Sequence, residues 1–495
     1  MLKFTLISYN PYNAVYRAKI SFQRIFARNV LIKNFSVLTL SNFLTQFLSV
    51  FVSIKIARSL SPETFGTYNL LLLHISIFAV ISSFGIRNII IRNIARNGNI
   101  VKKIFFTGLK LRVFGLLGSI CILYLYFLFY ADYSPLLLIF VIVGLISSVF
   151  YDLFESVAFG LEKMEFSGII DFLRTLCWLT TILVIPEKYL TIQIIFGLYV
   201  FFYLLKSIVY FFSINKKNIV KGFYTEKIVK ADTFHLVKES FPFYYLALFT
   251  LLSNQVPQLF LEYRSGVAQI GFFNIANKVL APINLIIGTI LTAVLPYLSR
   301  LYVNSYDAFI KSLKNIFIIV SLFCIAGAFG VMLFRKEFIM LLYGQKYVNS
   351  SLVLGYQVWY VAVYAVVCLI GTTLTVIDKQ KVLGRLSIVC TILQLPILWY
   401  GSQFGAQYLS AAFLIATALI LIIHVFVILK YLEGISFLFY LKLILLFITG
   451  YVLSSLPVDL NLYNKIILFA SASFLGGYFF FKKFRNRIAE IWAGK

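Results

Sequence analysis

Residues 406–429 read AQYLSAAFLIATALILIIHVFVIL, an apolar run that contains no Asp, Glu, Lys or Arg. A helix needs roughly 20 apolar residues to cross about 30 Å of bilayer hydrocarbon, because it rises about 1.5 Å per residue. The whole chain of 495 residues is 61% hydrophobic and 13% charged, with a mean hydropathy of +0.93. The sequence therefore predicts an all-α polytopic membrane protein with about 14 transmembrane helices, whose cores lie near 34–54, 68–86, 113–130, 135–158, 169–185, 189–213, 241–261, 276–298, 316–334, 352–376, 384–400, 406–429, 435–455 and 464–481.

The basic residues lie mainly in the short segments between these runs. The chain has 44 Lys and Arg against 18 Asp and Glu, a net charge of +26. The amino-terminal tail, the carboxyl tail and the links on the same face hold 32 of the basic residues, whereas the other face holds 9. The positive-inside rule then places both termini in the cytoplasm. The charge reports membrane topology, so no nucleic-acid partner is expected.

The longest internal polar segment, 215–240, carries six Lys and divides the predicted helices into two groups of six. A short repeat supports this division, because PETFGTY (62–68) and VAQIGFF (267–273) occupy the same place in each group. We predict a basic cytoplasmic segment at 1–33, without a cleaved signal peptide, and the following further units: an N-lobe at 34–214, a cytoplasmic linker at 215–240, a C-lobe at 241–432, two additional helices at 433–481 and a basic cytoplasmic tail at 482–495.

Three stretches resemble a known family: SLSPETFGTY (59–68), GFFNIANKVLAPINLIIGTILTAVLPYLSRLY (271–302) and LLYGQKYVNSSLVL (341–354). They are similar to segments of the polysaccharide transporter branch of the multidrug/oligosaccharidyl-lipid/polysaccharide exporter superfamily, which includes the Wzx-type O-antigen and capsule flippases. The resemblance implies a fold like that of the MATE transporters, with two pseudo-symmetric six-helix bundles, a central cavity and alternating access. For the two additional helices it leaves two roles open, simple packing or holding a lipid tail.

The resemblance also implies a function in the bacterial cytoplasmic (inner) membrane. That function is translocation of a polyprenyl-diphosphate-linked oligosaccharide for O-antigen, capsule or exopolysaccharide assembly. The expected partners are the lipid-linked glycan and membrane lipids, with glycan polymerase machinery as a further candidate. No cofactor is expected, and coupling to a proton or sodium gradient is left open.

Carrying a diphosphate through hydrocarbon costs at least several kcal/mol unless cations accompany it. Basic side chains in or near the spans are therefore candidates for substrate binding: Lys55, Arg58, Arg87, Arg174, Lys206 and Lys278. The alternative for those near an interface is that they extend to the lipid headgroups. Asn274, Asn277 and Lys278 recur at i, i+3 and i+4, a spacing that places them on one helix face.

Acidic residues are few in the spans. Asp152 and Glu155 near the end of the fourth span, with Asp171 and Arg174 at the start of the fifth, predict an ion-pair cluster at the cytoplasmic side. Such a cluster serves either as a structural network or as a gate that breaks and reforms. The sequence alone leaves both interpretations open.

Two competing functions are weighed against flipping. A cation-coupled multidrug-type antiporter would need an acidic site, yet the first span has none, and the seventh has Asn254 and Gln255 at its middle instead. Amides can bind sugar hydroxyls without imposing charge. A glycosyltransferase or ligase is the third possibility, but the outer links are short. No nucleotide-binding loop, nucleophile elbow or metal-spaced cluster occurs, so an enzyme is not expected.

Overall fold

The computed structural model describes residues 36–97, 101–129, 134–215, 230–455 and 465. All regular structure in these residues is helical, and twelve helices are long and apolar enough to cross a membrane. The predicted 1–33 segment, most of the 215–240 linker, the fourteenth span apart from Lys465, and the 482–495 tail lie outside the described residues. The helices are Ser36–Ser59, α2 (Pro62–Ser83), α3 (Arg87–Arg96), α4 (Val101–Phe129), α5 (Pro135–Gly160), α6 (Met164–Val184), α7 (Ile192–Asn215), α8 (Lys230–Asn254), α9 (Val256–Ser265), α10 (Val267–Asn304), α11 (Tyr306–Leu333), α12 (Arg335–Tyr343), α13 (Ser350–Val376), α14 (Gln380–Ser402), α15 (Ala406–Tyr431) and α16 (Phe437–Ser455).

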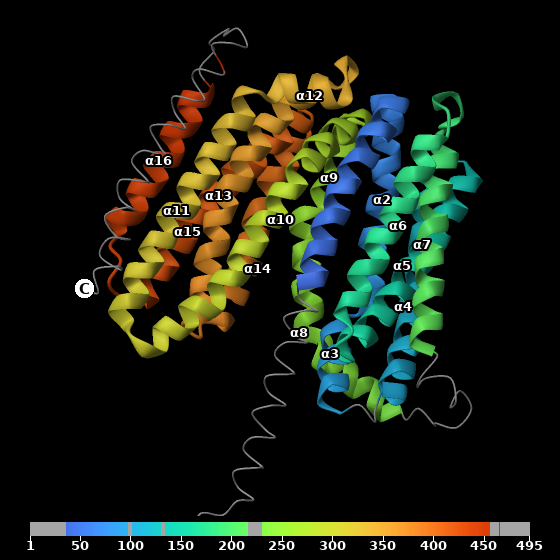
Figure 1. The fold of residues 1–495 in the computed structure, drawn as a ribbon, viewed down its shortest axis with the longest axis horizontal. Coiled ribbons are helices and arrows are strands. Elements are labelled where there is room, and N and C mark those ends of the chain that lie inside the picture. The colour runs from blue at the N-terminus through green and yellow to red at the C-terminus, as the bar shows by residue number, and fades with distance from the viewer. Residues whose placement is uncertain (1–35, 98–100, 130–133, 216–229, 456–464, 466–495) are drawn as a thin grey trace, which may run out of the picture.

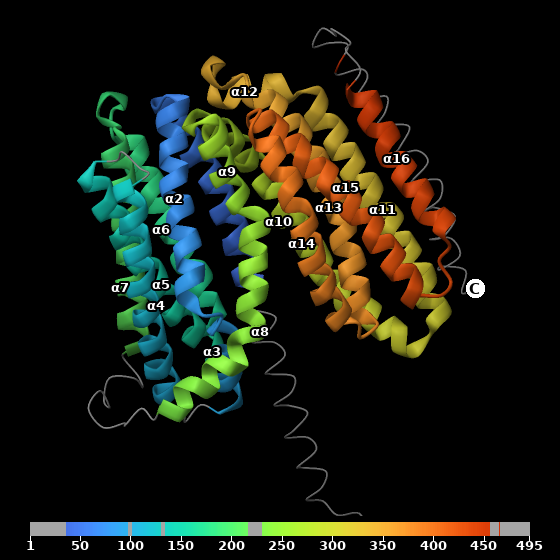
Figure 2. The same cartoon turned by 180° about the vertical axis from the view of Figure 1, so that it is seen from behind.

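The helices form two bundles that meet at one end and diverge toward the other (Figure 1). One bundle contains the Ser36–Ser59 helix and α2–α7, and the other contains α11 and α13–α16. The view from behind in Figure 2 shows the same separation, with α8, α9 and α10 between the bundles. The helix α10 packs against α2 of one bundle and α13 of the other. The upper end is defined here as the end with the links at 60–61, 266 and 403–405; the opposite end is the lower end.

The predicted fold class is confirmed, with three differences in the spans. The seventh is broken into α8 and α9 at Gln255, because Pro257 has no amide hydrogen for the carbonyl of Ser253 and its ring disfavours a continuous helix. The third begins at Val101, so Arg112 lies inside α4 and not in a polar link. The eighth span is also longer than predicted: α10 starts at Val267, which places Lys278 well inside it.

The two copies of the short repeat touch each other at the upper end. A Cβ atom at Gly66 of α2 would overlap the carbonyl oxygen of Val267, the first residue of α10. Reciprocally, a Cβ at Gly271 would overlap the carbonyl oxygen of Pro62, the first residue of α2. Each glycine thus meets the residue that begins the partner helix, four positions before the partner's own glycine. Such a reciprocal contact is expected at a pseudo-two-fold axis, and it brings the two backbones together as in small-residue helix crossings in membranes.

Two links at the lower end also share one geometry. Glu162 follows α5 with φ +60° and Asp378 follows α13 with φ +59°. The next residue in each link, Lys163 or Lys379, donates its amide hydrogen to a carbonyl five residues earlier, at 2.9 and 2.8 Å. Equivalent turns after the fourth and tenth spans are a second sign of internal duplication.

Polar contacts between the bundles close the upper end. The Arg58 guanidinium donates to the carbonyl oxygens of Leu341 and Leu342 at 2.5 and 2.9 Å. In return, Lys346 Nζ donates to the carbonyl oxygens of Arg58 and Leu60 at 2.6 and 2.5 Å. The end of the Ser36–Ser59 helix and the link after it therefore hold the end of α12 and the link after that helix. These contacts lie in or beside two of the three stretches that carry the family resemblance.

The helix α8 does not pack wholly with the second bundle. Its lower half contacts the first bundle, where Tyr244 Oη donates to the carbonyl of Ile81 at 3.1 Å and Glu239 pairs with Arg92 at 2.7 Å. Its upper half contacts α14 of the second bundle, where the hydroxyls of Ser253 and Thr391 lie 2.8 Å apart. The seventh span consequently connects the two bundles, whereas the predicted division at 241 assigns it to the C-lobe.

Candidate functional site

Two arginines and two carboxylates form an ion-pair network in the lower half of the first bundle. The Asp152 carboxylate accepts from Arg87 of α3 and, at 2.5 Å, from Arg112 of α4. Arg87 also pairs with Glu155 at 2.7 Å. The Arg112 side chain is only 1% exposed and donates as well to the carbonyl of Val149 at 2.7 Å. A buried guanidinium needs such partners, because an unpaired charge in the bilayer interior is costly.

A tyrosine joins this network to the other predicted pair. Tyr151 Oη donates to Glu155 at 2.5 Å and to Asp171 of α6 at 3.2 Å. Asp171 in turn pairs with Lys206 of α7, whose ammonium lies 3.2 Å from the centre of the Tyr151 ring. The structure thus brings together Asp152, Glu155, Asp171 and Arg174 as one cluster. All four belong to the first bundle, so the gate role remains a prediction.

Arg174 keeps unused hydrogen-bond donors. Its guanidinium lies 4.8 Å from the centre of the Tyr203 ring and 3.9 Å from Asp171, and one nitrogen donates to Thr175 at 3.1 Å. Nε and Nη1 are buried and have no hydrogen-bond partner among the described residues. Guanidinium groups present donors in a fixed fork that matches phosphate oxygens. Nε is near Asp171 without a hydrogen bond to it, so both nitrogens keep donors of the kind that suits a phosphate, and a substrate-binding role for Arg174 stays a prediction.

Lys278 provides a second cation from the opposite side. It lies on α10, close enough to Tyr203 to interact electrostatically. It has no hydrogen bond or ion pair to any part of the chain that the structure describes. Arg174 of the first bundle and Lys278 of α10, a helix of the seam formed by α8, α9 and α10 between the bundles, consequently both lie near Tyr203.

The predicted amides are distributed over two places. Asn274 donates to Gln258 of α9 at 2.9 Å, and Gln255 accepts from Ser76 of α2 at 2.9 Å, so both hold α9 and α10 in place. Asn254 lines a separate cavity between α8 and the second bundle. Asn277 is partly buried on α10, one residue before Lys278. Of the three residues predicted on one face of α10, Asn274 is hydrogen-bonded to Gln258, whereas Lys278 has no partner in the described part of the chain.

The remaining predicted cations lie at the upper end. Arg58 forms the inter-bundle contacts described above, and Lys55 pairs with the exposed Glu187 at 2.7 Å. Through its hydrogen bond and its charge, Lys55 holds the pKa of the Glu187 carboxyl below its ordinary value of 4.5. The pair is therefore intact at pH 7 and is lost only as the pH falls below that value.

We expect Lys55→Met and Glu187→Gln to change transport less than about twofold at pH 7, because an exposed ion pair contributes little. Transport in proteoliposomes at pH 7 measures this, and at pH 6 and pH 8, where the pair is also intact, the wild type and both variants should respond alike. A large loss in Lys55→Met that Glu187→Gln does not reproduce would instead return Lys55 to the substrate path.

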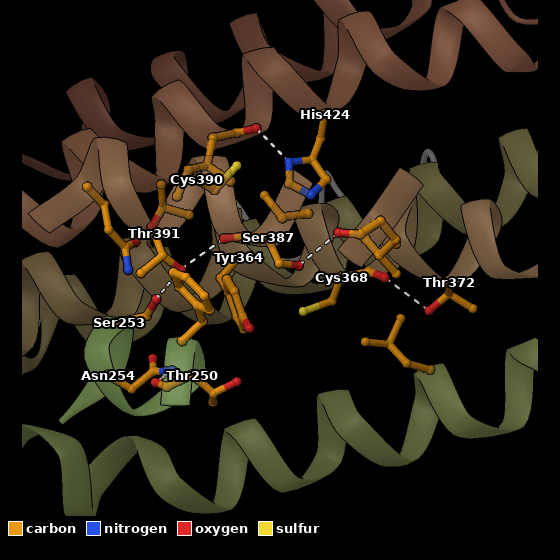
Figure 3. A pocket seen from close by; sticks show the side chains of 18 of the residues that line it. Thr250, Ser253, Asn254, Tyr364, Cys368, Thr372, Ser387, Cys390, Thr391 and His424 are labelled. Atoms are coloured by element: carbon orange, nitrogen blue, oxygen red, sulfur yellow. Dashed lines mark hydrogen bonds between the residues drawn. The ribbon is translucent and has the colours of Figure 1, made fainter. Parts of the chain in front are cut away.

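A cavity of about 560 Å³ lies in the second bundle, between α8, α10, α13, α14 and α15 (Figure 3). Sequence reasoning found one of its polar residues, Asn254, and missed the others. Most are single Ser and Thr residues in apolar helices, which individually resemble ordinary packing residues. Arg112, Tyr151 and Tyr203 were also missed, because their roles depend on partners from other helices.

A second hollow of about 450 Å³ lies between the Ser36–Ser59 helix and α10. Its walls are mainly apolar, with three small hydroxyl side chains, and are formed by Ser36, Thr39, Leu40, Phe43, Leu285, Ile286, Thr289 and Ile290. It lies below Lys278 along α10. An elongated apolar chain matches this groove better than a polar group.

The arrangement of helices is shared with known membrane transporters. The structure is similar to the lipid II flippase MurJ in an inward closed conformation, with a TM-score of 0.71, 16% identity, and coverage of 90% of this chain and 99% of that chain. It is also similar to an inward-facing MATE family multidrug transporter of the MOP superfamily, with a TM-score of 0.57, 14% identity and coverage of 85% and 98%. A point mutant of the Vibrio cholerae MATE transporter VcmN gives a TM-score of 0.53, 12% identity and coverage of 83% and 99%. At these identities the likeness concerns the fold, which is that of a multi-pass MATE-like membrane protein.

The sequence then places the chain more narrowly. The family model for polysaccharide biosynthesis proteins matches residues 31–302, more than half of the chain. The protein therefore belongs to the polysaccharide biosynthesis protein family, and the predicted resemblance to its transporter branch is confirmed. A comparison with curated proteins gave no match.

Proposed function

We propose that the protein moves a polyprenyl-diphosphate-linked oligosaccharide across the bacterial cytoplasmic membrane by alternating access, for O-antigen, capsule or exopolysaccharide assembly. The observation that carries the proposal is a pair of buried Arg174 nitrogens without a hydrogen-bond partner, together with Lys278 of α10, which has no partner in the described part of the chain. The lipid II flippase of the comparison has this fold and, by its name, flips a lipid. Family membership and fold thus agree with the chemistry of the site.

The charge balance of the site favours an anionic ligand. The residues of the first bundle that are joined by ion pairs carry four positive charges and three negative ones. They are the cations Arg87, Arg112, Arg174 and Lys206 and the carboxylates Asp152, Glu155 and Asp171. Lys278 adds a further positive charge across the seam. A diphosphate would complete this balance, and it would replace water as the partner of cations already held in a low-dielectric site.

The apolar groove between the Ser36–Ser59 helix and α10 supports a lipid-linked substrate. The described residues that line it carry no charge, so it suits the polyprenyl chain while the diphosphate lies at Lys278. The second bundle offers uncharged polar side chains for the sugar. Tail, diphosphate and glycan would then occupy three chemically distinct surfaces.

The direction of loading follows from the closed upper end. The positive-inside rule assigns the lower end to the cytoplasm, with both termini there. The Arg58 and Lys346 contacts close the upper side, so we infer that this state receives substrate from the cytoplasmic leaflet. Release to the other leaflet requires these contacts to break, and glycan polymerase machinery would use the product there.

The antiporter alternative is disfavoured by the partners of the acidic residues. Asp152, Glu155 and Asp171 each contact a basic side chain already, so none is a free acidic site for a lipophilic cation. We also propose no catalytic step, since flipping makes and breaks no covalent bond. Proton or sodium coupling remains a prediction.

Reconstitution tests the proposal directly. Proteoliposomes that contain the purified protein and a fluorescent undecaprenyl-diphosphate-linked oligosaccharide should expose the label to a membrane-impermeant quencher faster than protein-free vesicles do. Imposed pH or sodium gradients in the same vesicles identify the coupling ion. Equal rates with and without protein, together with drug-driven proton exchange, would favour the antiporter and contradict flipping.

A further inference from the structure

We propose that the cavity in the second bundle, called the C-lobe cavity here, is a subsite for uncharged, hydroxyl-rich sugar residues and excludes acidic ones. This inference rests on the proposed function, because it names the class of glycan carried by the lipid. Its volume of about 560 Å³ falls within the range of roughly 300–1,000 Å³ typical of small-molecule sites. The residues around it contrast sharply with the ion-pair network of the first bundle.

The first argument is charge. Among the described residues, no Asp, Glu, Lys or Arg lines the C-lobe cavity. His424 is the sole basic side chain in that described lining, and one of its ring nitrogens is already engaged with the carbonyl of Ile420 at 2.8 Å. A carboxylate or phosphate placed here would be a buried charge without a counter-charge, which is strongly unfavourable.

The second argument is the direction of the hydrogen bonds. Six hydroxyl groups of the lining donate to the carbonyl four residues earlier in their own helix, at 2.8 to 3.0 Å: Thr250, Thr292, Thr372, Thr375, Ser387 and Thr391. A hydroxyl that has committed its hydrogen presents only its lone pairs to the cavity. Figure 3 shows several of these side chains facing a common space. These six hydroxyls therefore accept hydrogen bonds from a ligand, which suits sugar hydroxyls and not an anion that can only accept.

Prolines add to this acceptor character. Pro257 and Pro296 have no amide hydrogen, so the carbonyls of Ser253 and Thr292 lack the usual donor four residues later. Both residues line the cavity. The Gln394 amide is likewise free of hydrogen bonds to the described part of the chain, and it can both donate and accept.

Aromatic rings provide the apolar contact that a pyranose face needs. Tyr360 and Tyr364 stack with ring centres 5.9 Å apart, and Phe413 lies 5.3 Å from Tyr360. The Tyr364 side chain is 45% exposed, so its ring is available to a ligand. Sugar rings have apolar faces with hydroxyl edges, and this combination of rings and acceptors matches both surfaces.

The cavity is also within reach of the diphosphate site. Lys278 and Tyr360 each lie about ten residues, or roughly 15 Å, below the upper ends of α10 and α13. Asn254 is the last residue of α8, and the ten residues of α9 lie between it and the upper end. The walls α8 and α10 belong to the seam between the bundles. A glycan attached to a diphosphate at Lys278 can therefore extend into the C-lobe cavity without leaving the substrate path.

Three synthetic ligands test the inference with the full-length protein in lipid nanodiscs, by isothermal titration calorimetry. They are farnesyl diphosphate, farnesyl-diphosphate-linked cellobiose, and the same disaccharide with glucuronate as its outer sugar. We expect the neutral glycolipid to bind at least tenfold more tightly than the acidic one. Equal affinities, or a neutral sugar that adds nothing to farnesyl diphosphate, would overturn the subsite while leaving flipping intact.

A matched pair of variants locates the effect. Thr372→Val and Thr449→Val each remove a hydroxyl bonded to the carbonyl four residues earlier, but only Thr372 lines the cavity. Thr372→Val should lower the affinity for the neutral glycolipid about threefold to tenfold and leave the affinity for farnesyl diphosphate unchanged. Thr449→Val should change neither affinity. Thr375→Val replaces it if the first variant does not fold. Failure of farnesyl diphosphate itself to bind the wild type would instead overturn the proposed function.

Discussion

Gly66→Ala and Gly271→Ala are each expected to reduce transport at least about fivefold. The added Cβ would overlap a carbonyl oxygen of the facing helix, at Val267 in one case and Pro62 in the other. Backbone atoms cannot turn aside as a flexible side chain can, so α2 and α10 must separate. Overpacking of this kind costs about 1–3 kcal/mol, which lowers the population of the upper-closed state roughly 5- to 150-fold.

The measurement has a structural and a functional part. Spin labels on the links after the Ser36–Ser59 helix and after α12 should report longer distances in both variants, and flipping in proteoliposomes should slow. Gly118→Ala in α4 and Gly327→Ala in α11 are the controls, because a Cβ at either glycine meets nothing within 4 Å. The free-energy cost of the double variant Gly66→Ala/Gly271→Ala should be smaller than the sum of the costs of the two single variants, since one separation of α2 and α10 relieves both overlaps. Unchanged distances in either single variant would show that this crossing does not control closure.

Hydropathy alone was sufficient to predict most of this fold. Each predicted span in the described residues corresponds to one helix, except the seventh, which Pro257 divides. The repeat around Gly66 and Gly271 predicted an internal duplication. It did not predict that the two glycines lie against each other, because contact between helices distant in sequence depends on tertiary packing.

The candidate site was less accessible to sequence reasoning. Arg112 looks like part of a basic link with Lys102, Lys103 and Lys110, yet it is buried because Asp152 of α5 lies opposite. Conversely, Lys55 and Arg58 are as basic as Arg174 but contact only the upper end. The C-lobe cavity carries no sequence motif at all. Its acceptor character arises only when hydroxyls from several helices face one space.

The two bundles thus divide the chemistry between them. The first holds paired charges with a small surplus of positive charge, and the second holds neutral acceptors. Helices α8, α9 and α10 connect the two; Pro257 lies where α8 and α9 are broken, and the reciprocal glycines lie where α2 and α10 cross. A ligand that bridges charged and neutral surfaces would therefore contact both parts that must move in alternating access.

The largest effect is expected from the two cations without a full set of partners in the described chain. Arg174→Ala and Lys278→Ala should each weaken binding of farnesyl diphosphate at least about 30-fold, because a desolvated contact between opposite charges contributes roughly 2–5 kcal/mol. Flipping and surface glycan should fall accordingly while the amount of protein in the membrane stays constant. Arg174→Lys should give an intermediate loss, since it retains the charge but not the planar fork of donors.

Two comparisons separate a phosphate contact from a general change of charge or stability. Lys311→Ala removes an exposed cation of α11 and should leave affinity and flipping unchanged. Each alanine variant should lose less affinity for farnesyl monophosphate than for farnesyl diphosphate. The monophosphate offers fewer oxygens to share between the two cations, so removal of one cation weakens its binding less. The Arg174 guanidinium lies over the Tyr203 ring and near Asp171, so measuring thermal stability of Arg174→Ala separates lost packing from lost phosphate binding. If both alanine variants bind the diphosphate as tightly as the wild type, the anion lies elsewhere and the surplus charge of this cluster serves the structure alone.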